Sequence, residues 1–203
     1  MQSSLHKHHR VSQRPIQVLC QGELICVTIG LDMNMIQPVP AASDTPGEML
    51  KRAMRHWATG VAVVTSEFGG FRHGMTVNSF TSVSVAPPLV TVTLANTTRT
   101  CALVLESGIY AVTILARDQQ HLSELFAGRI QEEGDRLANL LTFKLETGAP
   151  LLSGGAAFLD CRVIYQYSMP TSTLFVGEVL AADTGEPARP PLLYYNRAFT
   201  GLK

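Results

Sequence analysis

The stretch Gly74–Pro88, GMTVNSFTSVSVAPP, constrains the fold of this chain more than any other part of it. It reads as two short β-segments joined by a turn, and in its later half valines alternate with small polar residues. This period-two pattern places hydrogen-bonding groups on one face of a strand and packing groups on the other. A dense polar face without a charge suits a flat ligand held by hydrogen bonds. The alternative is an ordinary solvated strand face rich in serine and threonine.

The overall composition is that of a globular protein with no electrostatic bias. The chain has 203 residues, of which 46% are hydrophobic and 16% are charged, which is enough for one core. Sixteen basic residues balance sixteen acidic residues, so no net field attracts nucleic acid or an anionic membrane. We therefore expect no nucleic-acid binding and no membrane association.

The cysteines give no sign of a metal site. They stand at positions 20, 26, 101 and 161, without a C-x-x-C pair or zinc-ligand spacing. Cys101 and Cys161 lie within apolar patterns and are expected to be buried thiols. This usage favours a reducing compartment, and we expect a cytoplasmic protein.

The N-terminal part differs in character from the rest. Residues 1–46 are interpreted as a flexible or partly ordered leader, and residues 47–203 as the folded domain. The leader contains the basic cluster His6–Arg10, read as a flexible tail with metal capture as the alternative. The apolar stretch 16–31 is interrupted and too short to span a bilayer. Residues 37–47 have the composition of a linker.

One helix is expected ahead of the strands, over residues 47–59. Asp44 or Thr45 can cap it, and Gly60 ends it. Its apolar residues recur on one face at helical spacing: Leu50, Met54 and Trp57.

Short β-branched or alternating segments dominate the rest of the chain. The expected strands are 61–66, 71–77, 80–85, 89–95, 109–115, 157–167, 174–182 and 192–199. Gly69–Gly70 signals a hairpin turn, and the further expected helices are 119–126 and 132–141. Many short strands with few helices favour a mainly β (α+β) fold, and a closed barrel over an α/β sheet.

Common catalytic and nucleotide motifs are absent from the sequence. There is no G-x-G-x-x-G after a strand, no P-loop, no G-x-S-x-G elbow and no H-E-x-x-H. Serines and histidines are plentiful, but no pattern pairs a nucleophile with a base. We therefore assign no catalytic residue.

A series of fragments occurs in one order along the chain. They are TGVAVVTS (59–66), GMTVNSFTSVSVAPP (74–88), LVTVTLANTTRT (89–100), YAVTIL (110–115), LSELFAG (122–128), GAPLL (148–152), LDCRV (159–163), LFVGEVL (174–180) and PLLYYNRAF (191–199). In order and spacing this succession resembles the short-chain flavin reductases, the reductase components of two-component flavin-dependent monooxygenases. The resemblance runs from about residue 47 to the C-terminus.

The resemblance implies a homodimeric, FMN-binding split β-barrel with a few short flanking helices. Such proteins reduce FMN, less often FAD, with NADH or NADPH and release reduced flavin to a partner monooxygenase. Hydride transfer between stacked nicotinamide and flavin rings needs positioning rather than a protein acid or base. That requirement agrees with the lack of a catalytic pair in the sequence.

The resemblance also implies a flavin site. The ring and ribityl chain are expected against Thr76, Val77, Asn78 and Ser79, with a second wall from Ser82, Val83 and Ser84. The phosphate is expected at the loop Asn96, Thr97, Thr98, Arg99 and Thr100, with Arg129 as a second candidate. Neutral hydroxyls and amides match the ring's donors and acceptors without fixing one redox state by charge. Alternatively, Arg99 is a solvated loop charge and Arg129 a cation near a helix end.

One departure from the family pattern concerns the segment before TLFVGEV. Many members carry an Asp-His pair there, whereas this chain has Thr171 and Ser172. The family histidine is linked to nicotinamide binding or flavin contact, so the departure bears on donor preference and turnover. The departure leaves a second function as an alternative, that of a non-catalytic flavin- or haem-binding split-barrel protein. A structural β-barrel interaction module is a third reading, which leaves the donor-rich face without purpose. His73 is expected either near the ring or in a partly exposed turn.

Overall fold

The computed structural model of the protein describes residues 16–20, 23–27, 45–130, 134–185 and 187–202. The chain divides into two units, 1–44 and 45–203. In the first unit, β1 (Ile16–Cys20) and β2 (Glu23–Val27) pair as an antiparallel hairpin. The tail predicted at 6–10 and residues 37–44 of the predicted linker 37–47 lie outside the described residues. The last three residues of that linker, 45–47, form the cap and the start of a helix instead.

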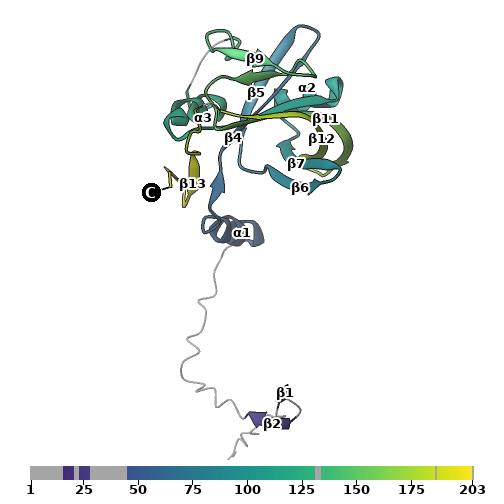
Figure 1. Ribbon diagram of the computed structural model, residues 1–203, viewed down its shortest axis with the longest axis vertical. Helices are drawn as coiled ribbons and strands as arrows, with labels where there is room; N and C mark the ends of the chain where they lie inside the picture. The colour runs from purple at the N-terminus through teal and green to yellow at the C-terminus, as the bar shows by residue number, and fades with distance from the viewer. Residues whose placement is uncertain (1–15, 21–22, 28–44, 131–133, 186, 203) are drawn as a thin grey trace, which may run out of the picture. The chain divides into compact units, whose positions relative to one another are not determined.

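An antiparallel sheet forms the centre of the second unit (Figure 1). Of the described residues, seven strands form it in the order β5-β4-β8-β11-β12-β7-β6. They are β4 (Ala62–Phe68), β5 (Phe71–Val77), β6 (Thr81–Val85), β7 (Pro88–Ala95), β8 (Ile109–Ile114), β11 (Ala157–Ser168) and β12 (Ser172–Thr184). The predicted turn at Gly69–Gly70 joins β4 to β5, and both glycines have positive φ.

A strand pair and a three-stranded sheet accompany this sheet. They are β9 (Thr142–Lys144) with β10 (Pro150–Leu152), and β3 (Thr59–Gly60) with β13 (Leu193–Tyr195) and β14 (Ala198–Thr200). The strand predicted over 192–199 is therefore a hairpin. Asn196 and Arg197 adopt φ values of 47° and 65°, which turn the chain back on itself.

Three helices lie within the described residues: α1 (Pro46–Met54), α2 (Arg99–Ser107) and α3 (Gln120–Phe126), the last preceded by the short helix η2 (Arg117–Gln119). The cap predicted for α1 is confirmed, because the Thr45 hydroxyl accepts the Glu48 N–H at 3.3 Å. After Met54 the hydrogen bonds change to the i→i−3 type, as from Trp57 N–H to Met54 C=O. α1 therefore ends earlier than predicted.

One helix was not predicted, and one helix prediction was wrong. The start of α2 was read as part of a loop over 96–100, but Thr98 caps the helix by accepting the Cys101 N–H at 3.2 Å, and Gly108 ends it with φ 69°. Over its described part, the helix predicted at 132–141 is a series of turns. There the Asp135 carboxylate accepts the Leu137 N–H at 2.8 Å, a local bond that competes with helix formation.

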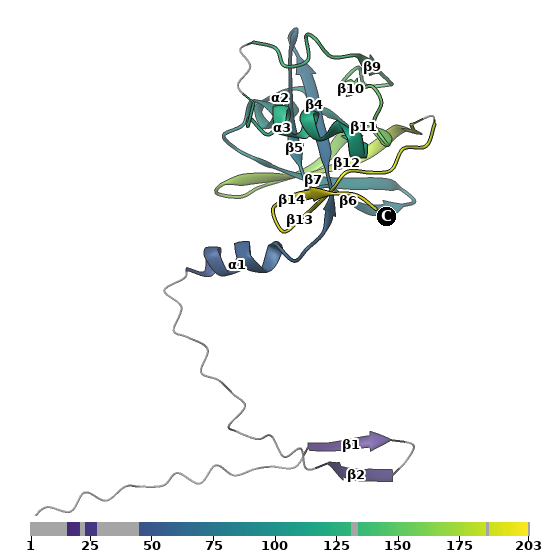
Figure 2. The same ribbon diagram turned by 90° about the vertical axis from the view of Figure 1, so that its left-hand side faces the viewer.

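The core lies between the curved sheet and these helices. α2 and α3 both pack on β4 and β5 (Figure 2). The largest fully buried side chains include Tyr110, Phe175 and Leu94, and Cys101 and Cys161 are buried free thiols as predicted. This mainly β arrangement with short helices is the one that the sequence predicts. None of the described helices has the length and apolarity needed to cross a bilayer.

Candidate functional site

A row of adjoining pockets follows β5. We call them the Asn78 pocket, the arginine pocket and the Phe71 pocket, with volumes of about 170, 690 and 420 Å³. The Asn78 pocket shares Thr76 and Ala127 with the arginine pocket. The arginine pocket in turn shares His73, Arg99 and Gly134 with the Phe71 pocket. The neighbouring pockets therefore share wall residues, and we call the three together the groove along β5. The two larger members match the roughly 300–1,000 Å³ of typical ligand sites.

Gly74 allows the inner wall of this groove to form. A Cβ at Gly74 would lie 3.0 Å from atoms of both Phe126 and Thr65. The missing side chain lets the end of α3 pack directly on β5, where the Thr76 hydroxyl donates to the Ser123 carbonyl at 2.7 Å. The chain after Phe126 is thereby brought to the arginine pocket, which Gly128 lines with φ 72°.

The N-terminus of α2 also lines the arginine pocket. Thr98 and Arg99, the cap and first residue of α2, both line the pocket. The first N–H groups of a helix lack intrahelical partners and attract anions. Thr100, which is fully buried, bonds through its hydroxyl to His73 Nδ1 at 2.8 Å and so ties α2 to β5.

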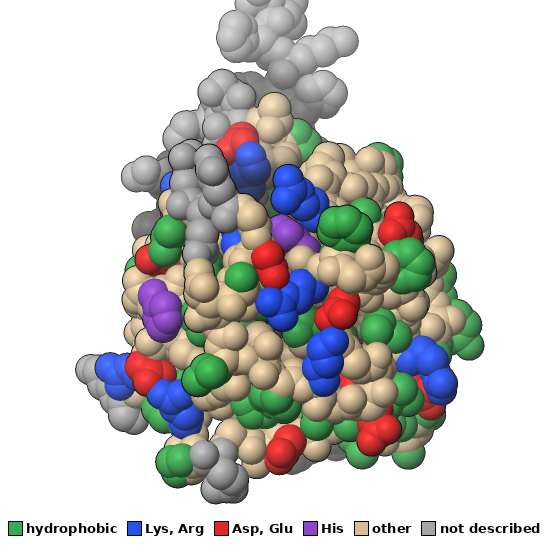
Figure 3. Space-filling view, turned by 90° about the horizontal axis from the view of Figure 1, so that it is seen from above, with side chains coloured by type: hydrophobic (Ala, Val, Ile, Leu, Met, Phe, Trp, Pro, Cys, Tyr) green, Lys and Arg blue, Asp and Glu red, His purple; other side chains and the backbone are tan. Residues whose placement is uncertain are grey.

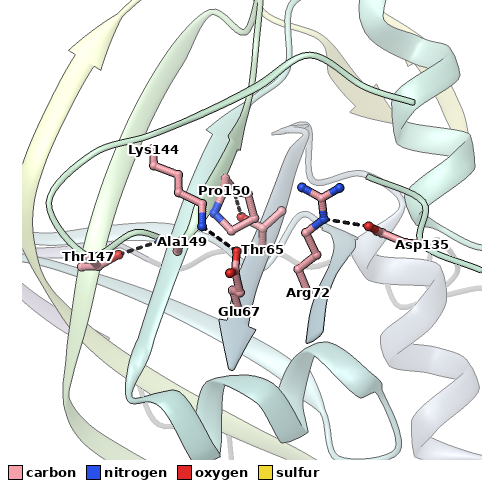
Figure 4. Close-up of polar contacts among 8 residues, drawn as sticks. All are labelled: Thr65, Glu67, Arg72, Asp135, Lys144, Thr147, Ala149 and Pro150. Carbon is pink, nitrogen blue, oxygen red and sulfur yellow. Dashed lines mark hydrogen bonds and ion pairs between the residues drawn. The ribbon is translucent and has the colours of Figure 1, made fainter. Parts of the chain in front are cut away.

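A turn anchored by charge completes the arginine pocket. Arg72 Nε on β5 lies 2.7 Å from Asp135 Oδ2 (Figure 4), and Leu137 is buried. The ion pair and the buried Leu137 hold Arg136 between them at the pocket. Its Nη2 atom lies 3.8 Å from the point that a Cβ would occupy if Gly128 had one.

The arginine pocket is electropositive. Desolvation, and then the charges of Arg136 and Arg99, lower the pKa of His73, while Asp135 acts in the opposite sense. The imidazole is therefore kept neutral near pH 7. The face in Figure 3 shows Lys or Arg side chains gathered beside a histidine, with acidic side chains nearby. Among the described residues, neither Arg99 nor Arg136 forms an ion pair with a carboxylate.

The Asn78 pocket is less charged and partly aromatic. Its lining includes Asn78, Val77, Arg129, Tyr194 and Phe199. Arg129 Cζ lies 6.0 Å from the centre of the Phe199 ring, and the Tyr194 and Phe199 ring centres are 5.2 Å apart. The β13–β14 hairpin thus supplies one side of this pocket and β5 another.

Some of the predicted flavin-site residues line the groove. They are Thr76, Val77, Asn78, Thr98, Arg99 and Arg129. Arg136, Tyr194 and Phe199 also line it but were not assigned to the site from the sequence. Tyr194 and Phe199 belong to the fragment PLLYYNRAF, which marked that segment without giving its role. Arg136 lies in the stretch that was read as a helix.

The other predicted residues do not line the groove, and several of them form hydrogen bonds elsewhere. Ser79 donates to the Thr93 carbonyl at 2.8 Å, and Ser84 donates to the Pro87 carbonyl. Asn96 donates to the Met169 carbonyl at 2.9 Å. None of Ser79, Ser82, Val83, Ser84, Asn96, Thr97 and Thr100 lines the pockets of the groove.

The departure at Thr171 and Ser172 lies next to the predicted phosphate loop. The Thr171 carbonyl accepts the Asn96 N–H at 3.1 Å, and Ser172 opposes Ala95 in the sheet. Within the described residues, no three His, Cys, Asp or Glu side chains gather as metal ligands.

Comparison with known proteins places the chain in a family. Residues 54–203 match the model of the flavin reductase like domain. An NADH-dependent flavin reductase from Rhodococcus sp. is 36% identical over 174 residues, covering 79% of this chain and 94% of that protein. The reductase component of an FADH2-dependent resorcinol hydroxylase from Rhizobium sp. is 34% identical over 160 residues, covering 78% and 88%.

Solved structures agree with this assignment. The NADH:FAD oxidoreductase of Streptomyces globisporus C-1027 has a TM-score of 0.73 at 32% identity, covering 81% of this chain and 99% of that one. The predicted fold class, a mainly β split barrel with short flanking helices, is confirmed by such neighbours. The chain therefore belongs to the flavin reductase-like domain family.

Proposed function

We propose that this protein is an NAD(P)H-dependent flavin reductase that reduces FMN or FAD and supplies reduced flavin to a partner monooxygenase. Family membership supports the reaction class, and the resorcinol hydroxylase relative supports the kind of partner. The observation that carries the proposal is the β5 groove, which combines an amide- and hydroxyl-bearing end with an electropositive end.

The residues of the groove fit a flavin. Asn78 and Thr76 offer neutral donors and acceptors to the heterocycle, and Tyr194 and Phe199 offer aromatic surface. At the other end, Arg99 and the first turn of α2 would hold the phosphate, because both favour an anion. Arg129, which lines the Asn78 pocket, is placed to contact the ribityl chain or phosphate.

Catalysis in this groove depends on binding and orientation. A bound flavin supplies the hydride-accepting chemistry, for which a protein acid or base is not required. The chain's residues hold the flavin, and Phe126 and Ala127 give the arginine pocket an apolar wall. Buried Thr100 holds His73 by a hydrogen bond, which fixes the imidazole in the groove. We propose NADH, the donor of the Rhodococcus relative, as the electron donor.

We also propose that residues 47–203 work as a homodimer, with residues 1–46 as a leader. Large apolar side chains are exposed on β6 and β11, among them Val83, Val85, Tyr165 and Tyr167. Exposed apolar side chains of this kind favour an interaction surface. β6 also carries Ser82 and Ser84, the predicted second wall that the chain's own groove does not use. The free thiols Cys101 and Cys161 favour a cytoplasmic location.

A second candidate function is a protein that holds flavin without reducing it. It is favoured by Thr171 and Ser172, which supply no imidazole at the position where the family pattern has its histidine. Steady-state NADH and NADPH oxidation, measured with FMN, with FAD and without flavin, separates the two. A reductase consumes the donor only when flavin is added. A protein that remains yellow through gel filtration but consumes no donor would contradict the reductase and support the second candidate.

A further inference from the structure

We propose that a cavity between the end of α1 and the β13–β14 turn binds a small aromatic carboxylate. We call it the Trp57 pocket, and its lining includes Met54, Arg55, Trp57, Tyr194 and Arg197. The Trp57 pocket shares Asn78 and Tyr194 with the Asn78 pocket, and it shares no lining residue with the other two pockets of the groove. The site therefore lies beyond the flavin groove, and binding there does not depend on flavin.

Hydrogen bonds of the main chain hold the two walls of the Trp57 pocket together. The Asn196 N–H donates to the carbonyl of Arg55, the C-cap of α1, at 3.0 Å and so joins the β13–β14 turn to the end of this helix. The Trp57 N–H donates to the Met54 carbonyl at 3.2 Å, which keeps the chain coiled beyond α1. Figure 2 shows α1 and the β13–β14 hairpin at the same end of the second unit. The pocket is thus formed within one chain.

The charge of the Trp57 pocket is the first argument. Among the described residues, no Asp or Glu lines it, and neither Arg55 nor Arg197 forms an ion pair with a carboxylate. Lys51 also lines the pocket, but its Nζ lies 2.7 Å from Glu48 Oε1. The Nε atom of Arg55 is buried and has no hydrogen-bond partner within the described part of the chain. Because guanidinium groups bind carboxylates through paired N–H donors, the two arginines favour such an anion.

The backbone conformation of Arg197 is the second argument. Tyr195 opposes Ala198 in the hairpin, so Asn196 and Arg197 alone form the turn. Their φ values of 47° and 65° are both positive, as in the type I′ hairpin turn, whose second position favours glycine. Residues held in such unfavourable conformations cluster at sites that clamp ligands. We attribute the arginine in this turn to a contact that its side chain makes in the pocket.

The aromatic surface and the size of the pocket are the third argument. Trp57 is 65% exposed, and Tyr194 and Met54 line the cavity with it. Surfaces of this kind pack against flat aromatic rings. The volume of about 260 Å³ is below the roughly 300–1,000 Å³ of typical ligand sites, which favours a compound with one ring over a dinucleotide such as NADH. An aromatic ring that carries a carboxylate therefore matches both the rings and the arginines of the lining.

The test is a titration of the purified full chain with benzoate, followed by tryptophan fluorescence. Trp57 is the only tryptophan in the sequence, so the signal reports on this pocket. Benzoate is expected to quench the fluorescence saturably. Benzamide keeps the ring without the charge, and acetate keeps the charge without the ring, so both are expected to bind at least about tenfold more weakly. Calorimetry is expected to give the same benzoate affinity with and without riboflavin.

Two variants test the arginines. Arg55→Gln and Arg197→Gly are each expected to weaken benzoate binding about tenfold or more. Arg197→Gly is also expected to unfold at a higher urea concentration than wild type, because glycine adopts the turn conformation without strain. A loss of affinity in a more stable protein cannot come from unfolding. Arg162→Gln, an exposed arginine on β11, is the matched control and is expected to bind benzoate like wild type.

Other outcomes overturn the proposal, each in a recognisable way. Equal binding of benzoate and benzamide, or unchanged affinity in both arginine variants, excludes a role for the charge. Displacement of benzoate by NADH or riboflavin assigns the pocket to the ligands of the proposed reductase. A tryptophan emission maximum that shifts with protein concentration assigns the pocket to a contact between two copies of the chain. An absence of saturable quenching contradicts the site itself, and flavin binding by the same preparation would then leave the proposed function intact.

Discussion

β5 and β6 are successive strands with different surroundings. The end of β5 and the whole of β6 come from the segment 74–88, in which small hydroxyl residues accompany valines. On β5, Val77 is 6% exposed and Thr76 bonds to α3, whereas on β6, Val83 and Val85 are 55% and 88% exposed. The comparison shows that the residue pattern predicts where a strand forms, whereas the elements packed against the strand determine whether it lines a site. β5 lines a groove within one chain, and the apolar side chains of β6 remain exposed.

The largest effect is expected from a substitution at Gly74, where α3 packs against β5. Gly74→Val places side-chain atoms where Phe126 and Thr65 now approach to 3.0 Å from the Cβ position. Overpacking of this kind should lower the free energy of unfolding by about 2–3 kcal/mol, measured by urea denaturation. Gly60→Ala is the control, since no atom lies within 4 Å of its Cβ position. An equal loss in both variants would contradict the packing role of Gly74.

The next largest effect concerns the anion site of the groove. Arg99→Gln removes a charge beside the α2 N-terminus and should weaken FMN binding about 10- to 100-fold, since a bond to a charged group contributes about 1.5–3 kcal/mol. Riboflavin, which has no phosphate, should bind the variant as it binds wild type. A similar loss of riboflavin affinity would show that Arg99 acts on the fold or the ring rather than on the phosphate.

A substitution on β6 is expected to change the oligomeric state with little effect on stability. Val85→Asp places a charge on a side chain that is 88% exposed in the single chain, so the unfolding free energy should change by less than about 0.5 kcal/mol at low concentration. The sedimentation coefficient should shift from dimer to monomer, because a charge in an apolar interface is unfavourable. A wild-type protein that sediments as a monomer would contradict the proposed interface.

The smallest effect is a pH dependence at His73. Because burial and two arginines lower its pKa from 6.5 in the folded chain, the unfolded chain binds a proton first as the pH falls. Stability is therefore complete above about pH 6.5 and decreases as the pH falls toward the lower folded-state pKa. His73→Gln should show a weaker decrease between pH 7 and 5, whereas the exposed His121→Gln should follow wild type. A decrease of equal steepness in His73→Gln would exclude this histidine as its source.

Local signals explain what the sequence predicts correctly. The strand 71–77, the turn at Gly69–Gly70 and the Thr45 cap each depend on residues that are adjacent in the chain. α2 was missed because its start was read as a phosphate loop, and Thr98 serves as a helix cap within that same segment. Whether the segment 96–100 is read as a loop or as the start of a helix, Thr98 and Arg99 follow β7 closely. The prediction that they belong to the site therefore did not require α2 to be recognised.

Arg136 shows which part of the site local reasoning does not reach. Its position depends on the ion pair between Arg72 and Asp135, residues far apart in the sequence. No periodicity or motif marks such a turn. The pockets likewise depend on α3 crossing β5 at Gly74, a contact that only the folded chain reveals.

The central claim is that the groove along β5, from Asn78 to the α2 N-terminus, is the flavin site. A crystal structure of the full chain soaked with FMN tests it most directly. We expect the ring beside Asn78 and Tyr194, and the phosphate at Thr98 and Arg99. A flavin bound elsewhere, with this groove empty or filled by side chains, would contradict the account.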